Sequence, residues 1–430
     1  MLRFLIKLKT IENQVSNYMA NLKTNTKKSS TYLLMTLMLT IVIDIMGFSL
    51  VFPILPALFV SGKAILVGTH LSLKMRYVFY GIALALWPVG TFFGTPYLGQ
   101  LSDKFGRKNL LIVCLIVTGI GYSFYAIAIY LHSAILFFVT RLFSGFFGGN
   151  YDIAQAATAD ISPKELKMRN MGWISVAAAI GMIIGPAIAS FTTSSRIISW
   201  FSIVTPFWIA ATFAILNAIL IMILFRETYK TKKKTHISLS KIFSAFLFIF
   251  TDKRVILLGI AFFLLNLGWG FYLTAMPLIL TQIFHFSIQF AGIFFCVLGI
   301  GSIFAILFVQ PLILQKTSLK NIFIYCAIII AVLLIISDIH PSLKEMWIAV
   351  FVFAVLQILC FSSLLAMCSN AVTIDEQGKV MGGIGAVTSV SFFAASMLLA
   401  WLTHFSVMLP LIVAAIAFGL SGLLMLKHTK

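Results

Sequence analysis

Twelve stretches of this sequence are long and apolar enough to cross a membrane as helices, and this limits the possible fold more than any other feature. A spanning helix needs roughly 20 mostly apolar residues. The predicted spans are Thr31–Val60, Tyr77–Gly99, Asn109–Leu131, Ala134–Ala159, Met171–Phe191, Ser202–Phe225, Val255–Phe284, Ile288–Leu314, Asn321–Ser337, Met346–Val372, Val380–Thr403 and Val407–Leu426. We therefore expect an all-α membrane protein with twelve transmembrane helices.

Composition excludes the soluble alternatives. Of the 430 residues, 61% are hydrophobic and only 10% are charged, which leaves too few polar side chains to cover a soluble enzyme or a nucleic-acid-binding domain. The sequence contains no Walker-type phosphate loop, so any transport work draws on a gradient or on a partner. The five cysteines lie in apolar runs without the spacing of metal ligands, and we expect neither a metal nor a cofactor.

Lysine and arginine are distributed unequally between the two sides of the predicted spans. Of the 31, 25 lie on the N-terminal segment, the even-numbered connections and the C-terminus, one (Arg141) lies within a span, and five lie on odd-numbered connections: Lys63, Lys74, Arg76, Arg196 and Lys344. Basic residues are enriched on cytoplasmic loops, so both termini are predicted to be cytoplasmic. The net charge of +19 therefore indicates orientation in the membrane and no nucleic-acid partner.

Short internal repeats indicate two related halves. The run KNLLIVC at Lys108–Cys114 returns as KNIFIYC at Lys320–Cys326, and Met171-Gly172 returns as Met381-Gly382. Such repeats are typical of transporters whose binding site lies between the halves. The predicted organisation is a cytoplasmic segment 1–30, a six-helix half 31–225, a cytoplasmic linker 226–254, a pseudo-symmetric six-helix half 255–426 and a cytoplasmic tail 427–430.

The predicted linker is the longest polar stretch between spans and carries the basic run Lys232–Lys234. Its basic residues fit an orientation signal on a solvated tether. The alternative is binding of anionic lipid headgroups, which basic segments next to a membrane attract.

The connection between the second and third spans reads GQLSDKFGRK, with Gly99, Asp103, Gly106, Arg107 and Lys108 at its fixed positions. This run resembles the signature GxLxDrxGrk of the major facilitator superfamily, at the loop and membrane face where that family carries it. Other parts of the chain resemble the tetracycline-efflux-type, twelve-helix drug:proton antiporters of this family: Asp44–Pro56, Arg141 with Gly145, Ala159–Pro163, and Gly181 and Gly185 with Pro186.

The resemblance implies that the loop run latches the cytoplasmic side shut. Asp103 would accept hydrogen bonds from the free backbone donors at the start of a nearby helix, such as the eleventh span near Gly378–Val380. The alternative is a basic turn with an ordinary helix cap.

Gly181 and Gly185 lie four residues apart on one helix face, which allows another helix to approach closely, and Pro186 favours a bend. The resemblance implies that these two glycines and this proline are a motif of antiporters, and therefore that the transporter exports its substrate. Plain helix packing is the alternative.

Asp44 is the candidate proton carrier. It lies about 12 residues into the first span, roughly 18 Å deep, and its own span carries no lysine or arginine. A carboxylate at that depth is costly unless it faces water or takes up a proton; a permanent structural hydrogen bond is the alternative. Arg141, the one cation within a span, is expected to hold a carboxylate or carbonyl oxygens.

Asp152 follows Arg141 by about three helical turns, so we expect Arg141, Gly145, Gly148, Asp152 and Gln155 on one face of the fourth helix. Asp152 departs from the small or neutral residue that the resemblance leads us to expect. It is interpreted as a second proton site or a site for a cationic substrate, or as a side chain that reaches to the cytoplasmic end. Gly121-Tyr122 stands in the third span where tetracycline exporters tend to carry an acidic residue, which argues against tetracycline as the substrate.

The resemblance implies a substrate cavity lined by spans one, four, seven and ten. The candidates there are Phe48, Gln155, Asn266, Trp269, Tyr272 and Gln357. A mixed aromatic and polar wall suits an amphipathic solute.

The sequence thus predicts a monomeric secondary transporter of the inner membrane, with a small-molecule substrate, protons and membrane lipid as partners, that exports amphipathic compounds. The alternatives are a metabolite or siderophore permease and a non-transporting receptor or scaffold.

Overall fold

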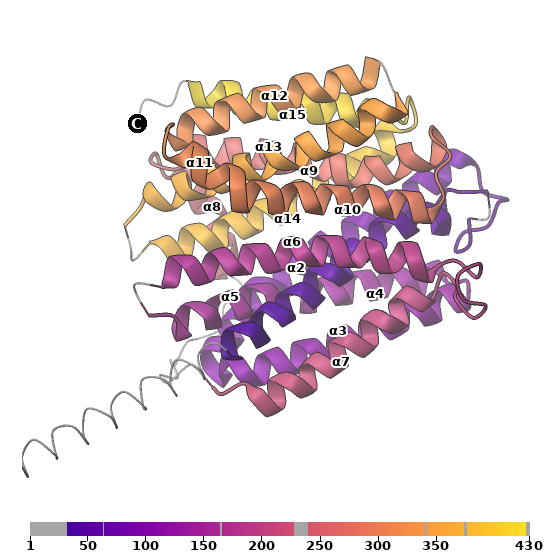
Figure 1. Cartoon of the computed structure of the whole chain (residues 1–430), viewed down its shortest axis with the longest axis horizontal. Helices are drawn as coiled ribbons and strands as arrows, with labels where there is room; N and C mark the ends of the chain where they lie inside the picture. The colour runs from indigo at the N-terminus through magenta and orange to yellow at the C-terminus, as the bar shows by residue number, and fades with distance from the viewer. Residues whose placement is uncertain are drawn as a thin grey trace, which may run out of the picture.

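The computed structural model describes residues 32–62, 64–163, 166–227, 240–339, 342–373 and 376–426, and these residues form helices without any β-strand (Figure 1). The predictions for the segment 1–30, for the run Lys232–Lys234 and for the tail 427–430 lie outside the described residues. The helices are Tyr32–Phe59, α2 (Leu73–Phe105), α3 (Arg107–Tyr130), α4 (Ala134–Phe147), α5 (Asn150–Ile161), α6 (Lys167–Thr192), α7 (Thr205–Leu224), α8 (Ser240–Thr251), α9 (Ile256–Gln282), α10 (Ile288–Phe304), a π-helical turn (Ala305–Val309), α11 (Gln310–Leu314), α12 (Leu319–Ile339), α13 (Leu343–Asn370), α14 (Gln377–Leu402) and α15 (Leu409–Leu426).

Eleven helices of the described residues are long and apolar enough to cross a membrane, and they correspond to eleven of the twelve predicted spans. The fourth predicted span is not one continuous helix, because it divides into α4 and α5 at Gly148–Gly149. The Gly148 N–H bonds to the Gly145 carbonyl at 3.2 Å, and the regular ladder restarts with the Ile153 N–H on the Gly149 carbonyl at 3.1 Å. Each glycine costs a helix about 1 kcal/mol relative to alanine, so two in succession favour a break here.

A further helix, α8, lies within the segment predicted as a linker. Its sequence SKIFSAFLFIFT is mostly apolar, which favours packing over a solvated tether. It packs against α14 and α9 of the second half.

The helices form two groups that correspond to the two predicted halves, with α2–α7 on one side and α8–α15 on the other (Figure 1). Within the first half the main packing pairs are α2 with α4 and α3 with α7, and within the second half they are α12 and α9 with α15. The halves meet where α6 packs against α10 and α2 packs against α14.

Glycines allow the closest of these approaches. A Cβ at Gly94 of α2 would collide with the backbone of Phe146 in α4, and a Cβ at Gly90 would collide with the Leu142 carbonyl. Small residues at helix crossings are the usual means of close packing in membranes. This crossing places the middle of α4, with Arg141, next to α2.

The two ends of the bundle differ. We call the end with the α2–α3 turn and the starts of α9 and α14 the linker end, and the opposite end the far end. At the far end the Tyr80 hydroxyl of α2 donates to the Thr274 carbonyl of α9 at 2.9 Å, and the Ser190 hydroxyl of α6 donates to the Gln289 carbonyl at 2.9 Å. The halves are therefore bonded to each other at the far end.

At the linker end, α6 and α14 face open space. Apart from the neighbouring backbone of the same helix, no atom of the described residues lies within 4 Å of the place that a Cβ would take at Gly172 of α6 or at Gly378, Gly382 and Gly385 of α14. Among the described residues, the halves are thus bonded at the far end, whereas these faces of α6 and α14 are uncovered at the linker end, which we call the open end.

Candidate functional site

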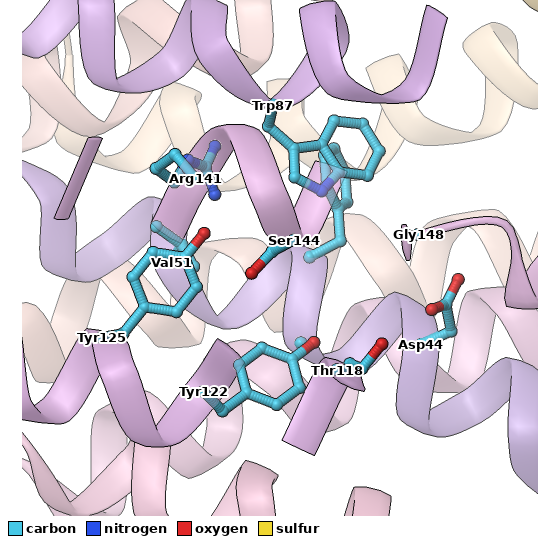
Figure 2. A pocket seen from close by; sticks show the side chains of 11 residues that line it. Asp44, Val51, Trp87, Thr118, Tyr122, Tyr125, Arg141, Ser144 and Gly148 are labelled. Atoms are coloured by element: carbon cyan, nitrogen blue, oxygen red, sulfur yellow. The ribbon is translucent and has the colours of Figure 1, made fainter. Parts of the chain in front are cut away.

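A small polar pocket lies inside the first half (Figure 2). Figure 2 shows Asp44 and Arg141 at opposite ends of it, with the side chains of Ser144, Thr118 and Tyr122 between them. The full lining is Asp44, Gly47, Phe48, Val51, Trp87, Thr118, Tyr122, Tyr125, Arg141, Ser144 and Gly148. These residues come from the helix Tyr32–Phe59, from α2 and α3, and from α4 with Gly148 at its end, so the pocket depends on how these four helices pack together.

Asp44 is half-buried and contacts the start of α5. The Asn150 side-chain amide donates to Asp44 Oδ1 at 3.2 Å and lies 3.3 Å from the Thr118 hydroxyl. The backbone N–H of Tyr151 lies against the same carboxylate. The break at Gly148–Gly149 therefore presents helix-start donors to Asp44, as broken helices do for anions within membranes.

Close packing fixes the helix Tyr32–Phe59 on both sides of Asp44. A Cβ at Gly47 would collide with the Tyr122 hydroxyl, and one at Gly185 would collide with the Ser49 hydroxyl and the Met46 carbonyl. The Ser49 hydroxyl also donates to the Gly181 carbonyl at 3.1 Å. Gly181 and Gly185 thus mark the place where α6 crosses the Asp44 helix.

Arg141 is 4% exposed, and its Nε donates to the Ala83 carbonyl of α2 at 2.9 Å. Among the described residues no ion pair joins Arg141 to Asp44. The hydroxyls of Tyr125 and Ser144 are buried and have no hydrogen-bond partner within the described part of the chain. Unpaired hydroxyls beside a cation suit a pocket that holds water.

Asp152 lies in the first turn of α5 and is exposed, whereas Ile153 and Ala154 beside it are buried. Gln155 is half-buried. Because of the break, Asp152 and Gln155 do not continue the helix of Arg141 and Gly145, so the prediction of one shared helix face is wrong. α5 packs against α2, α3 and α6 of its own half.

The predicted cavity residues separate into two groups. Phe48 lines the pocket, and its ring centroid lies 4.6 Å from that of Trp87. The candidates of the second half are part of its packed interior in this structure. Tyr272 is 1% exposed, and its ring stacks on that of Phe353 with the two ring centroids 3.8 Å apart. The ring of Trp269 also stacks on that of Phe353, with the centroids 5.8 Å apart.

Asn266 and Gln357 are also buried, at 1% and 6% exposure. The Asn266 amide donates to the Phe262 carbonyl of its own helix at 2.9 Å. A cavity-lining role for this second group stays a prediction.

The loop run forms a network at the linker end. The Arg107 guanidinium bonds to Asp160 at the end of α5, and it pairs with Asp103 at 3.3 Å. Glu227 caps α3, since its carboxylate accepts the backbone N–H groups of Arg107 at 3.0 Å and Lys108 at 3.2 Å. Asp103 therefore pairs within its own half here.

Two glycines of this run differ in their surroundings. Gly106 has a φ of 98°, in the left-handed region that favours glycine, and a Cβ there would also meet the Glu227 carboxylate. Gly99 faces open space, as does Gly378 at the start of α14. The contact expected between Asp103 and α14 is not made in this open form and stays a prediction for a form closed at the linker end.

Sequence reasoning missed Asn150, Glu227 and the hydroxyls of Tyr125 and Ser144. An asparagine after two glycines inside an apolar span is a signal that could have identified the helix break. Glu227 offered none, because its partners lie more than a hundred residues earlier in the chain.

A bundle of membrane-crossing helices in two related halves is the architecture of many membrane transporters, and a family match over most of the chain identifies it as a transporter and not an enzyme. The family model of the Major Facilitator Superfamily matches residues 37–396, and the chain belongs to this superfamily.

The relatives include drug-resistance proteins. The chain is 30% identical over 197 residues to the tetracycline resistance protein, class B, of Escherichia coli, a match that spans 45% of this chain and less than half (44%) of that protein. It is 25% identical over 383 residues to the tetracycline resistance protein, class H, of Pasteurella multocida, across 86% of this chain and 89% of that one. The crystal structure of a D-xylose-proton symporter shares the fold, with a TM-score of 0.74 at 16% identity over 93% of this chain and 97% of the other.

Proposed function

We propose that this transporter exports small amphipathic compounds from the cytoplasm in exchange for protons, by alternating access across the inner membrane. The observation that carries the proposal is Asp44, a carboxylate within a span that faces a polar pocket and has an amide as its side-chain partner. A membrane carboxylate without a cation partner is favoured in its protonated form and exchanges its proton when its surroundings change.

Export is favoured by the crossing of α6 on the Asp44 helix. The antiporter-type glycines Gly181 and Gly185 contact the residues on either side of Asp44, from Val42 to Leu50. A movement of α6 therefore acts directly on the proton carrier. The resistance proteins among the relatives also favour export, since removal from the cell is a direct way for a transporter to give resistance.

The open linker end fits a loading state for export. The basic residues around this end favour a cytoplasmic location for it, so a compound in the cytoplasm or inner leaflet would enter at the linker end. Protonation of Asp44 from the far side and substrate release there would complete the cycle.

The test is reconstitution of the purified protein into liposomes with an imposed pH gradient and a panel of compounds, tetracycline included. Expected is uptake or expulsion of at least one amphipathic compound that follows the proton gradient and stops when an ionophore collapses it. Transport in the same direction as the protons would instead indicate a permease. Binding without any transport would indicate a receptor.

A further inference from the structure

One hydrogen bond between the halves joins two side chains that can each carry a positive charge. At the far end, Lys74 in the first turn of α2 donates from Nζ to Nε2 of His404, two residues after the end of α14, over 3.1 Å. A lysine ammonium has donors only, so Nε2 is the acceptor, and it accepts only in a neutral imidazole. The contact therefore requires an uncharged His404.

The contact lies at the outer edge of a close crossing between α2 and α14. About two turns further along α2, a Cβ at Gly81 would meet the Ser396 carbonyl of α14 at 2.8 Å and the Ala400 Cβ at 3.1 Å. α2 and α14 belong to different halves, so a separation of the halves at the far end breaks this crossing and the Lys74–His404 bond together.

The His404 ring is held in a turn and stays open to solvent. The His404 N–H bonds to the Trp401 carbonyl at 3.3 Å, and the ring lies edge-on to that of Phe405 with the centroids 5.4 Å apart. Both His404 and Lys74 are exposed. Protons of the far-side solution therefore reach the imidazole directly.

The other bonds that join the halves at the far end do not respond to pH near neutrality. Tyr80 and Ser190 use hydroxyl groups as donors to backbone carbonyls, and the Gln289 amide donates to the Thr193 hydroxyl. These groups keep their charge state around pH 7, whereas histidine titrates near pH 6.5. The bond to His404 is thus the one of these four that acid can break.

The charged groups around the end of α14 give a protonated His404 no acidic partner in the described residues. The Arg76 guanidinium of α2 is bonded to backbone carbonyls of its own half. The phenols of α2 and α9 are neutral near pH 7, and no ion pair of the described residues includes His404. The charged residues of the described helices that pack against α14 near this end or belong to it are Lys74 and Arg76 of α2, Lys344 and Glu345 at the start of α13, and Lys379 at the opposite end of α14.

We propose that Lys74 and His404 form a pH-sensitive latch, which holds the halves together at the far end while His404 is neutral and releases them when His404 takes up a proton. Protonation removes the acceptor and places two positive charges at contact distance, and separation of the halves relieves that repulsion. The latch is therefore present above about pH 6.5 and is lost below it. An acidic solution on the far side would favour opening to that side, and this effect does not depend on Asp44.

The experiment measures the separation of the halves by double electron–electron resonance between two nitroxide labels on the purified protein in lipid nanodiscs. The labels are attached through Tyr130→Cys at the end of α3 and Leu343→Cys at the start of α13, two exposed positions at the far end in different halves. Protein without these two substitutions gives the background from native cysteines.

Expected is a population with a longer distance that grows about threefold when the pH falls from about 8 to about 5.5, the size for one exposed charged contact, with its midpoint near pH 6.5.

Three substitutions test the two partners of the latch. His404→Gln keeps an acceptor that does not titrate, so the distances should be the same at both pH values. His404→Lys carries a charge at both pH values and should show the longer distance at both. Lys74→Met removes the donor and the repulsion, and should also lose the pH response.

His70→Gln is the matched control, because His70 is an exposed histidine in the connection before α2 at the same end. This variant should respond to pH as the wild type does.

The outcomes separate the latch from the proposed function. Equal distances at both pH values in the wild type, or a pH response that persists in His404→Gln, would overturn the latch. The response should persist in Asp44→Asn; its loss there would assign it to the proton carrier and overturn the latch, while the proposed function would stand. Failure of proton-driven transport together with an intact latch response would overturn the proposed function alone.

Discussion

At the residue scale, the pocket keeps its cation and its anion apart. Arg141 is bonded to the Ala83 carbonyl of α2, whereas Asp44 is bonded to Asn150. A direct ion pair would hold Asp44 ionised and resist proton exchange. The separation leaves its charge state dependent on the start of α5, which suits a carrier better than a structural carboxylate.

Asp44→Asn is therefore expected to leave a folded, membrane-inserted protein, because the change removes a half-buried acid within a span and puts an isosteric amide in its place. Gradient-driven transport in liposomes should fall to background, while exchange of labelled for unlabelled substrate without a gradient should continue. Undiminished accumulation against a gradient would contradict the assignment of Asp44 as the proton carrier.

At the scale of the helices, the site is positioned by close helix crossings and by the break between α4 and α5. The sequence predicted Asp44, Arg141 and the Gly181–Gly185 face, because charges and glycines in apolar runs stand out. It did not predict the break at Gly148–Gly149 or the contact of Asn150 with Asp44. Both depend on which helices pack together, and an apolar periodic run looks the same whether or not the helix is interrupted.

The crossing of α6 predicts a contrast between two glycines of one helix. Gly185→Ala adds a methyl group that collides with the Met46 carbonyl, and we expect it to cost about 1–3 kcal/mol of stability. Gly172→Ala points into open space and should change stability by no more than about 0.5 kcal/mol, apart from any gain in helix propensity. The melting temperatures of the two variants in detergent measure this difference. Equal melting temperatures would show that the crossing is not closely packed.

α8 is anchored to the second half by a charged cluster. Arg254 bonds to Glu376 before α14 and to Asp252 after α8, each at 2.8 Å. The Lys379 ammonium lies 4.2 Å from the ring centroid of Phe248, and the Arg254 hydrogen bonds lower the pKa of Asp252 from 3.8 to about 2 and that of Glu376 from 4.5 to about 2.

These pKa values predict how the anchor responds to acid. Since both are depressed, the contribution of the cluster is fully present above pH 4.5 and is lost as the pH falls toward about 2. The difference in melting temperature between the wild type and Arg254→Gln should be constant above pH 4.5 and shrink below it. A difference that changes around pH 6–7, where histidine titrates, would contradict this origin and would connect the anchor to the pH response of transport.

At the scale of the whole molecule, the two halves differ in chemistry. Asp44, Arg141 and Asp152 belong to the first half, whereas the charged residues of the second half, such as Lys320, lie at the ends of its described helices. The sequence predicted both halves, since span length and basic loops follow from the membrane itself. It did not predict the end at which they open, because one sequence must support both forms and their difference in free energy is small.

Closure of the linker end is expected to depend on Asp103. In this form Asp103 pairs with Arg107, and the described residues leave Gly378 and Gly382 at the start of α14 uncovered. If Asp103 joins the start of α14 when the linker end closes, Asp103→Asn weakens the closed form alone and shifts the population toward the open one.

A cysteine at Gly385, which faces open space, is the probe, and most native cysteines are buried and label poorly. Labelling of this cysteine by a thiol reagent should become several-fold faster in Asp103→Asn, by the loss of one charged hydrogen bond. Glu345→Gln, an exposed carboxylate at the far end, is the matched control and should leave the rate unchanged. Unchanged labelling and transport in Asp103→Asn would limit Asp103 to pairing with Arg107 within the first half.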